Sequence, residues 1–164
     1  MSSRFRAIIT PMKPLFLRLT PYLMLLMASC GSLPERLSSG PHPVADRIVF
    51  SAIQYVDVPY EFGGMSREGV DCSGLVYLAH QSAGLQVPRT SLNQYRKAKR
   101  VRKNQMRAGD LLFFKLNTKR VSHVGIYLGD GRFIHAPRTG KKVSYSHLDN
   151  RFWRTRWVSV GRYY

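Results

Sequence analysis

One cysteine and two histidines are the residues of this sequence best suited to do chemistry. Cys72 stands in the tetrapeptide Asp71-Cys72-Ser73-Gly74, where we predict that a helix begins. The partial positive charge at a helix N-terminus favours the thiolate, the nucleophilic form, and so lowers the pKa of a cysteine. A buried structural cysteine would fit as well, because Cys72 is in phase with Leu75, Val76 and Ala79. Taken alone, Cys72 favours the structural interpretation.

Two histidines downstream supply what a cysteine nucleophile needs. Strand-like alternation over residues 122–128 places His123 on one face, and His135 lies on the next predicted strand. A histidine beside a cysteine can take the thiol proton and later protonate the leaving amine, while a third group fixes its tautomer. We therefore predict Cys72 as nucleophile, His123 as base and His135 as the orienting residue. The other histidines lack this context and are interpreted as surface residues: His42, His80 and His147.

The turn between the two histidine strands decides whether they can meet. A two-residue turn at Asp130-Gly131 would pair Ile126 with His135 and put the histidines on opposite faces. A three-residue loop over 129–131, or a bulge with the same parity, puts His135 opposite Gly125 and diagonal to His123. We predict the second arrangement, in spite of the Asp-Gly signal for a tight turn.

One cysteine and two histidines could also bind zinc, with water as the fourth ligand. The sequence has no close ligand pair such as HExxH or CxxC. We therefore predict neither a metal nor a cofactor.

The elements that position these residues follow from apolar spacing. We predict a first helix over about 44–56, a second from about Cys72 to Gly84, and partly helical structure in the polar stretch 89–104. Short segments rich in β-branched or aromatic residues follow Gly109, and we predict them as strands: 111–116, 122–128, 132–137, 143–147 and 157–163. Helices followed by strands indicate an α+β domain with an antiparallel sheet.

Four ordered blocks of this sequence resemble the signature of the NlpC-type cell-wall peptidases. They are residues 59–64 with 69–76 (PYEFGG and GVDCSGLV), 107–114 (RAGDLLFF), 122–127 (SHVGIY) and 133–136 (FIHA), and the similarity runs from about residue 46 to 160. The resemblance implies a small papain-like α+β domain, in which helices pack on an antiparallel sheet. It also implies that Cys72, His123 and His135 match the nucleophile, the base and the orienting residue.

The resemblance implies further roles around the nucleophile. Tyr60 matches a tyrosine whose hydroxyl approaches the reacting carbonyl, although it could be only a core aromatic. Asp71 and Ser73 match positions that contact the free amine of the substrate, but aspartate is also a common helix cap. Arg89 lies in a segment, PRTS, that resembles a family loop at the cleft edge, which implies that Arg89 binds substrate, although the segment could be a plain turn. The backbone N–H of Cys72 would be one donor to the oxyanion.

The N-terminal residues differ from the rest of the chain. Residues 1–29 combine four basic residues and no acid with a short apolar run, which is typical of a secretory signal peptide, although an uncut anchor helix has a similar pattern. Met27-Ala28-Ser29-Cys30 resembles the lipobox of bacterial lipoproteins, which implies a lipid on Cys30; Gly31 then indicates the outer membrane. Residues 30–43 are predicted to be a flexible tether and 44–164 the peptidase domain. A Cys30–Cys72 disulfide would require that the signal stays uncut.

The charge of the chain narrows its partners. The formal net charge is +17, and removing the four basic residues of 1–29 leaves +13. For an exported protein this favours anionic polymers of the envelope over nucleic acid, and much of it could be a solvated surface. We predict a cysteine endopeptidase that hydrolyses peptidoglycan stem peptides or cross-links through an acyl-enzyme on Cys72. The D-alanine–diaminopimelate cross-link is favoured over the D-glutamate–diaminopimelate bond, and a non-catalytic wall-binding lipoprotein is the alternative.

Overall fold

The computed structural model describes residues 42–116 and 118–164, so the predictions for the signal peptide, Cys30 and most of the tether concern residues outside it. The described elements, in chain order, are α1 (Pro43–Ile53), α2 (Cys72–Ser82), α3 (Ser91–Lys97), β1 (Lys99–Val101), the 3-10 turn η1 (Lys103–Gln105), β2 (Leu111–Phe114), β3 (His123–Gly129), β4 (Arg132–His135), β5 (Ser144–His147), α4 (Arg151–Arg156) and β6 (Trp157–Arg162). None of the helices in this part of the chain is both long and apolar enough to cross a bilayer.

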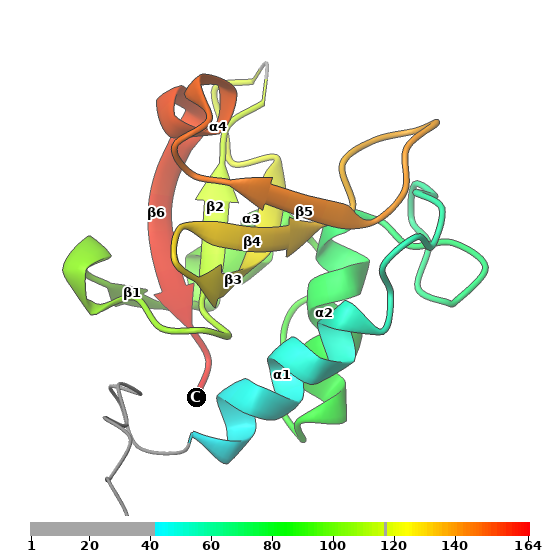
Figure 1. The fold of residues 1–164 in the computed structure, drawn as a ribbon, viewed down its shortest axis with the longest axis horizontal. Helices are drawn as coiled ribbons and strands as arrows, with labels where there is room; N and C mark the ends of the chain where they lie inside the picture. The colour runs from blue at the N-terminus through cyan, green and yellow to red at the C-terminus, as the bar shows by residue number, and fades with distance from the viewer. Residues whose placement is uncertain (1–41, 117) are drawn as a thin grey trace, which may run out of the picture. The chain divides into compact units, whose positions relative to one another are not determined.

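The strands form one antiparallel sheet in the order β1-β6-β2-β3-β4-β5. Helices α1 and α2 pack against each other, and both pack on β3, so they cover the same side of the sheet (Figure 1). The predicted α+β architecture is therefore confirmed. We call the side of the sheet under α1 and α2 the helix face and the opposite side the histidine face.

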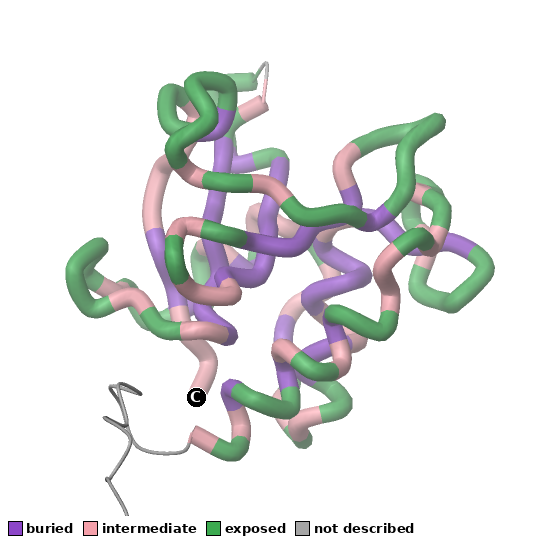
Figure 2. Tube along the Cα trace, in the orientation of Figure 1, coloured by how far each residue is buried: buried purple, intermediate pink, exposed green. Residues whose placement is uncertain are grey.

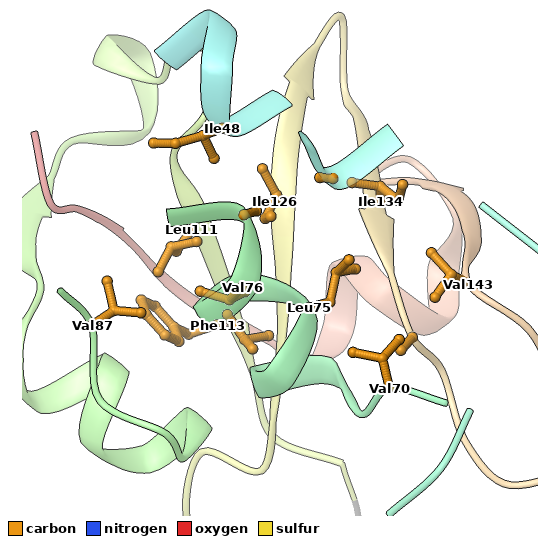
Figure 3. Packing of buried hydrophobic residues seen from close by; sticks show 14 of the residues in the cluster. Ile48, Val70, Leu75, Val76, Val87, Leu111, Phe113, Ile126, Ile134 and Val143 are labelled. Atoms are coloured by element: carbon orange, nitrogen blue, oxygen red, sulfur yellow. The ribbon is translucent and has the colours of Figure 1, made fainter. Parts of the chain in front are cut away.

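The main core lies between the helix face and the helices. In β2, Leu111 and Phe113 belong to this core, while the alternating residues belong to a second cluster on the histidine face. Leu75 and Val76 of α2 lie over the sheet residues, as Figure 3 shows, and all four of these side chains are fully buried. This packing holds α2 against the helix face of the sheet.

The histidine face has a smaller aromatic cluster. It contains Phe114 of β2, Phe133 of β4 and Trp153 of α4, and Trp153 is only 8% exposed. Figure 2 shows that β2 and β3 are buried along most of their length, whereas the loops over 60–69 and 137–142 are largely exposed. The short helix α4 therefore covers this second cluster through Trp153.

Three sequence-based expectations differ from the structure. Helix α1 ends at Ile53, and β1 and α4 were not predicted. His80 is fully buried, so its interpretation as a surface residue is wrong. It lies one helical turn after Val76, whose carbonyl oxygen is 2.9 Å from Nδ1 of His80, and therefore on the buried side of α2.

Candidate active site

His123 and His135 share the histidine face, as predicted. Ile126 pairs with Ile134 and Tyr127 with Phe133, so the same register brings Gly125 opposite His135. His123 Nε2 lies 2.9 Å from His135 Nδ1. The two imidazoles therefore form a hydrogen-bonded pair.

The turn that brings them together differs from the predicted loop. Gly129 pairs with Arg132, which leaves a two-residue turn at Asp130-Gly131. Asp130 has φ 48° and Gly131 has φ 74°, the positive values that a tight hairpin turn of this type requires. The register shifts between Tyr127 and Gly129, so Leu128 is left out of the pairing. The three-residue loop is wrong, and the alternative of a bulge with the same parity is right.

Aromatic rings enclose the histidine pair. Trp153 stacks on His123 with ring centroids 5.4 Å apart and meets His135 edge-on at 4.8 Å. Burial lowers the pKa of His123 well below 6.5, with a further contribution from His135, and lowers the pKa of His135 to about 4. Both rings are therefore neutral near pH 7, and each has one bare nitrogen that can accept a hydrogen bond or a proton.

A serine that the sequence analysis missed completes this network. Ser146 Oγ on β5 lies 3.0 Å from His135 Nε2. Ser146 is paired with Phe133 in the ladder, and Ser144 is opposite His135, so Ser146 reaches His135 diagonally. Because the alternation of β5 is weak, nothing in its sequence, SYSH, distinguishes Ser146 from Ser144.

Cys72 is the first residue of α2 and carries a free, half-buried thiol. Burial, and after it the Asp71 carboxylate, raises the pKa of Cys72 to about 11, although backbone N–H groups led by that of Val124 act in the opposite direction. The predicted lowering by the helix terminus is thus wrong, because desolvation outweighs it. The resting pair is a thiol and a neutral imidazole, so the proton must leave the sulfur during attack.

The loop over residues 60–70 lies tightly against the start of α2. A Cβ atom on Gly74 would clash with the carbonyl oxygen of Gly64, so glycine is required at this helix start. Tyr60 is held by its backbone N–H, which donates to the Lys141 carbonyl at 2.8 Å. Burial raises the pKa of Tyr60, and a negative charge on Cys72 or on Asp71 raises it further. Tyr60 therefore remains a hydroxyl donor beside the thiol.

Asp71 is both a helix cap and an ion-pair partner. Its Oδ1 accepts from Gly74 N at 2.6 Å, and Arg89 binds both carboxylate oxygens, at 2.9 and 2.7 Å. Ser73 Oγ donates to Oδ1 and Gly63 N to Oδ2, both at 3.0 Å. Burial opposes ionisation of Asp71, but the hydrogen bonds, led by those from Arg89, lower its pKa overall.

These groups border one pocket of about 380 Å³. It is lined by Tyr60, Phe62 and Gly63; by Asp71, Cys72 and Ser73; by Arg89, Thr90 and Ser91; and by Ser122. The pocket therefore unites five predicted residues, Tyr60, Asp71, Cys72, Ser73 and Arg89. His123 of the histidine pair directly follows Ser122, which also lines the pocket. Phe62 also lines the pocket and is 88% exposed, and the sequence analysis missed it.

The zinc alternative does not fit this geometry. The ring nitrogens His123 Nε2 and His135 Nδ1 face each other at hydrogen-bond distance rather than a common point. Within residues 42–116 and 118–164, no group of three or more His, Cys, Asp or Glu residues is arranged to hold a metal ion.

A cysteine at a helix N-terminus, with a histidine whose far nitrogen is held by a second polar group, is the arrangement of papain-like cysteine hydrolases. The chain belongs to the NlpC/P60 family, whose model matches residues 57–162.

Similar proteins and solved structures agree with the assignment to the NlpC/P60 family. The chain is 37% identical over 126 residues to the probable endopeptidase YafL of Escherichia coli strain K12, covering 74% of this chain and 51% of YafL. It is 37% identical over 140 residues to the murein DD-endopeptidase MepH of the same strain, covering 82% and 52%. A crystal structure of an NlpC/P60 family protein from Bacillus cereus ATCC 10987 superposes with TM-score 0.70 at 34% identity, covering 75% and 41%. The chain thus spans about half the length of these relatives or less.

Proposed function

We propose that this protein is a cysteine endopeptidase that hydrolyses peptide bonds in peptidoglycan through an acyl-enzyme on Cys72. The observation that carries the proposal is the buried histidine pair, His123 Nε2 to His135 Nδ1 at 2.9 Å, together with a pocket that is lined by Cys72 and by Ser122, the residue before His123. Family membership and the name of the murein endopeptidase relative support the substrate class.

The reaction follows from the available atoms. His123 Nε2 is occupied by His135, so His123 Nδ1 is the nitrogen left for Cys72. The thiol proton passes to Nδ1 as the sulfur attacks the carbonyl carbon, and the same proton leaves with the amine when the C–N bond breaks. Water then adds to the thioester, gives a proton to His123, and releases the carboxylic acid as the thiol regains that proton.

Two donors at the pocket can stabilise the oxyanion. The backbone N–H of Cys72 lies at the start of α2, where N–H groups have no partner within the helix. Tyr60 lines the same pocket, and its raised pKa keeps the hydroxyl proton in place for donation. We assign Tyr60 this role.

The state of Asp71 favours cleavage of a cross-link. A carboxylate offers about four lone-pair sites, and Asp71 already accepts five hydrogen bonds, two of them from Arg89. A free substrate amine would have to displace Arg89 to bind there. The D-alanine–diaminopimelate cross-link needs no such amine, so we propose it over the D-glutamate–diaminopimelate bond.

Digestion of purified peptidoglycan with the full-length protein tests both statements. Mass spectrometry should show cross-linked dimers converted to monomers, whereas release of dipeptides would assign the other bond. Cys72→Ser and Cys72→Ala should abolish hydrolysis while circular dichroism stays that of the wild type. A wild type that binds peptidoglycan without cutting it would make the protein a wall-binding lipoprotein instead.

We also propose that Cys30 carries the lipid and anchors the protein to the periplasmic face of the outer membrane. The residues Met27 to Ser29 before Cys30 and Gly31 after it support this. Mass spectrometry of the membrane fraction should find an acylated N-terminal Cys30. Recovery of an uncut chain, or of a soluble unmodified one, would contradict the proposal.

A further inference from the structure

The histidine pair can hold its protons in two ways, and only one of them is compatible with a base. If His123 carries its proton on Nδ1, no bare nitrogen is left for the Cys72 thiol. If His123 carries it on Nε2, that N–H donates to His135 Nδ1, 2.9 Å away, and leaves Nδ1 of His123 bare. His135 must then carry its own proton on Nε2.

The proton on His135 Nε2 points at Ser146. The distance from His135 Nε2 to Ser146 Oγ is 3.0 Å, and His135 is 2% exposed, so little water reaches the ring. An N–H left without an acceptor at this position would be costly. A hydroxyl can accept while turning its own hydrogen away, and Ser146 is only half-buried, so that hydrogen can meet solvent.

We propose that Ser146 is a positioning residue which accepts a hydrogen bond from His135 Nε2 and thereby holds His123 in the tautomer that can take the proton of Cys72. The network thus runs from Cys72 through His123 and His135 to Ser146. Ser146 does not line the pocket and acts only through His135. This inference rests on the proposed function, because the tautomer matters only if His123 is a base.

The chain offers a matched control for this role. Ser144 is on the same strand and directly opposite His135 in the ladder, but it is exposed. Ser144→Ala therefore removes the same hydroxyl from β5 two residues away. Ser146→Thr keeps a hydroxyl on a residue type that strands tolerate well. Ser146→Asp keeps an acceptor but no donor.

Kinetics on a cross-linked muropeptide should separate a positioning role from a binding role. Ser146→Ala should lower kcat roughly tenfold, the size of one lost hydrogen bond, and leave KM unchanged. Ser146→Thr should restore kcat, and Ser144→Ala should match the wild type. Ser146→Asp should keep activity and move the acid limb of the pH profile upward, because a carboxylate stabilises the protonated histidine pair. Wild-type kcat in Ser146→Ala would overturn the proposal.

Long-range proton–nitrogen NMR spectra of the imidazoles test the tautomer without any substrate. In the wild type, both His123 and His135 should carry the proton on Nε2; in Ser146→Ala, His135 should lose this single state, and Ser146→Thr should regain it. A wild-type His135 with bare Nε2 would overturn the proposal even if peptidoglycan is cut. Conversely, a wild-type protein that does not hydrolyse peptidoglycan would contradict the proposed function. The NMR spectra would still show which tautomer His123 and His135 adopt.

Discussion

The two faces of the sheet are built from the same strands but do different work. On the helix face, side chains such as Phe113 and Ile126 pack against Leu75 and Val76 of α2 in a continuous apolar core. On the histidine face, the cover is a single short helix, and polar rings lie inside an aromatic cluster. Alternation along β3 therefore lets neighbouring residues, Val124 and His123, serve the core and the site separately.

This difference predicts that substitutions on the two faces separate stability from activity. Substitutions on the helix face should change the free energy of unfolding and leave the activity of each folded molecule unchanged. Substitution of the histidines on the histidine face should change the chemistry at little cost in folding. The following experiments test that separation.

The largest effect is expected for His123→Phe on the histidine face. Loss of the proposed general base should lower kcat/KM by about 10³- to 10⁴-fold, because the nitrogen that takes the thiol proton is removed. The phenyl ring fits an aromatic cluster, so the free energy of unfolding should change by only about 1–2 kcal/mol. Hydrolysis of peptidoglycan and urea denaturation measure the two quantities. A variant that unfolds instead would show that His123 supports the fold.

Leu75→Ala on the helix face should do the opposite. Its side chain is fully buried, so its truncation should lower the free energy of unfolding by about 3 kcal/mol, as measured by urea denaturation. Activity per folded molecule should remain. Ile53→Ala is the control, since Ile53 is 38% exposed on α1 and should cost less than about 1 kcal/mol. Loss of activity at full stability would contradict the separation of the two faces.

A smaller effect is expected from His80, the buried histidine of the helix face. Burial lowers its pKa from 6.5 to about 4. As the pH falls, the imidazole of His80 is therefore protonated in the unfolded chain at a higher pH than in the folded protein. Its contribution to stability is complete above pH 6.5 and is lost as the pH falls, by about 2 kcal/mol at pH 5. In His80→Phe, the loss of stability between pH 7.5 and pH 5 should therefore be smaller by that amount. Equal losses in both proteins would rule out this role of His80.

The smallest effect is expected for Trp153→Phe. Phe keeps an aromatic cover but loses the wider stack on His123, which should cost about 1 kcal/mol of stability. Because the histidines become less buried, the pKa of His135 should rise from about 4, and NMR titration can follow it. An unchanged pKa would show that other groups keep water from the pair.

The buried face of a helix or strand could be predicted from the sequence where the apolar periodicity was strong. Alternation in residues 122–128 predicted that His123 lies on one face of its strand, and the spacing of Leu75, Val76 and Ala79 predicted the buried stripe of α2. The strand β1 has only three residues, two of them exposed and charged, and α4 has six, so neither shows a repeat. Both are formed by tertiary contacts.

The site was predictable in its residue types but not in its electrostatics. The types and order of Cys72, His123 and His135 were enough to predict them as one site, whereas the pKa of Cys72 depends on how deeply the folded chain buries the thiol. The partner of Asp71 was equally hidden, because Arg89 is eighteen residues away in the sequence. Ser146 required the register of β4 and β5, which local sequence does not encode.

The bulge at Leu128 makes the hairpin one residue longer than its ladder needs. Side chains alternate between the two faces of a strand. A tight Asp130-Gly131 turn on an unbroken ladder would therefore place His135 on the opposite face from His123. Because Leu128 is left out of the pairing, His135 lies on the same face as His123, and the turn at Asp130-Gly131 stays tight. A chain that lacked Leu128 altogether would close the same turn with Tyr127 still opposite Phe133. This hairpin can therefore be shortened by one residue here without moving either histidine to the other face, whereas forcing Leu128 into the ladder would separate them.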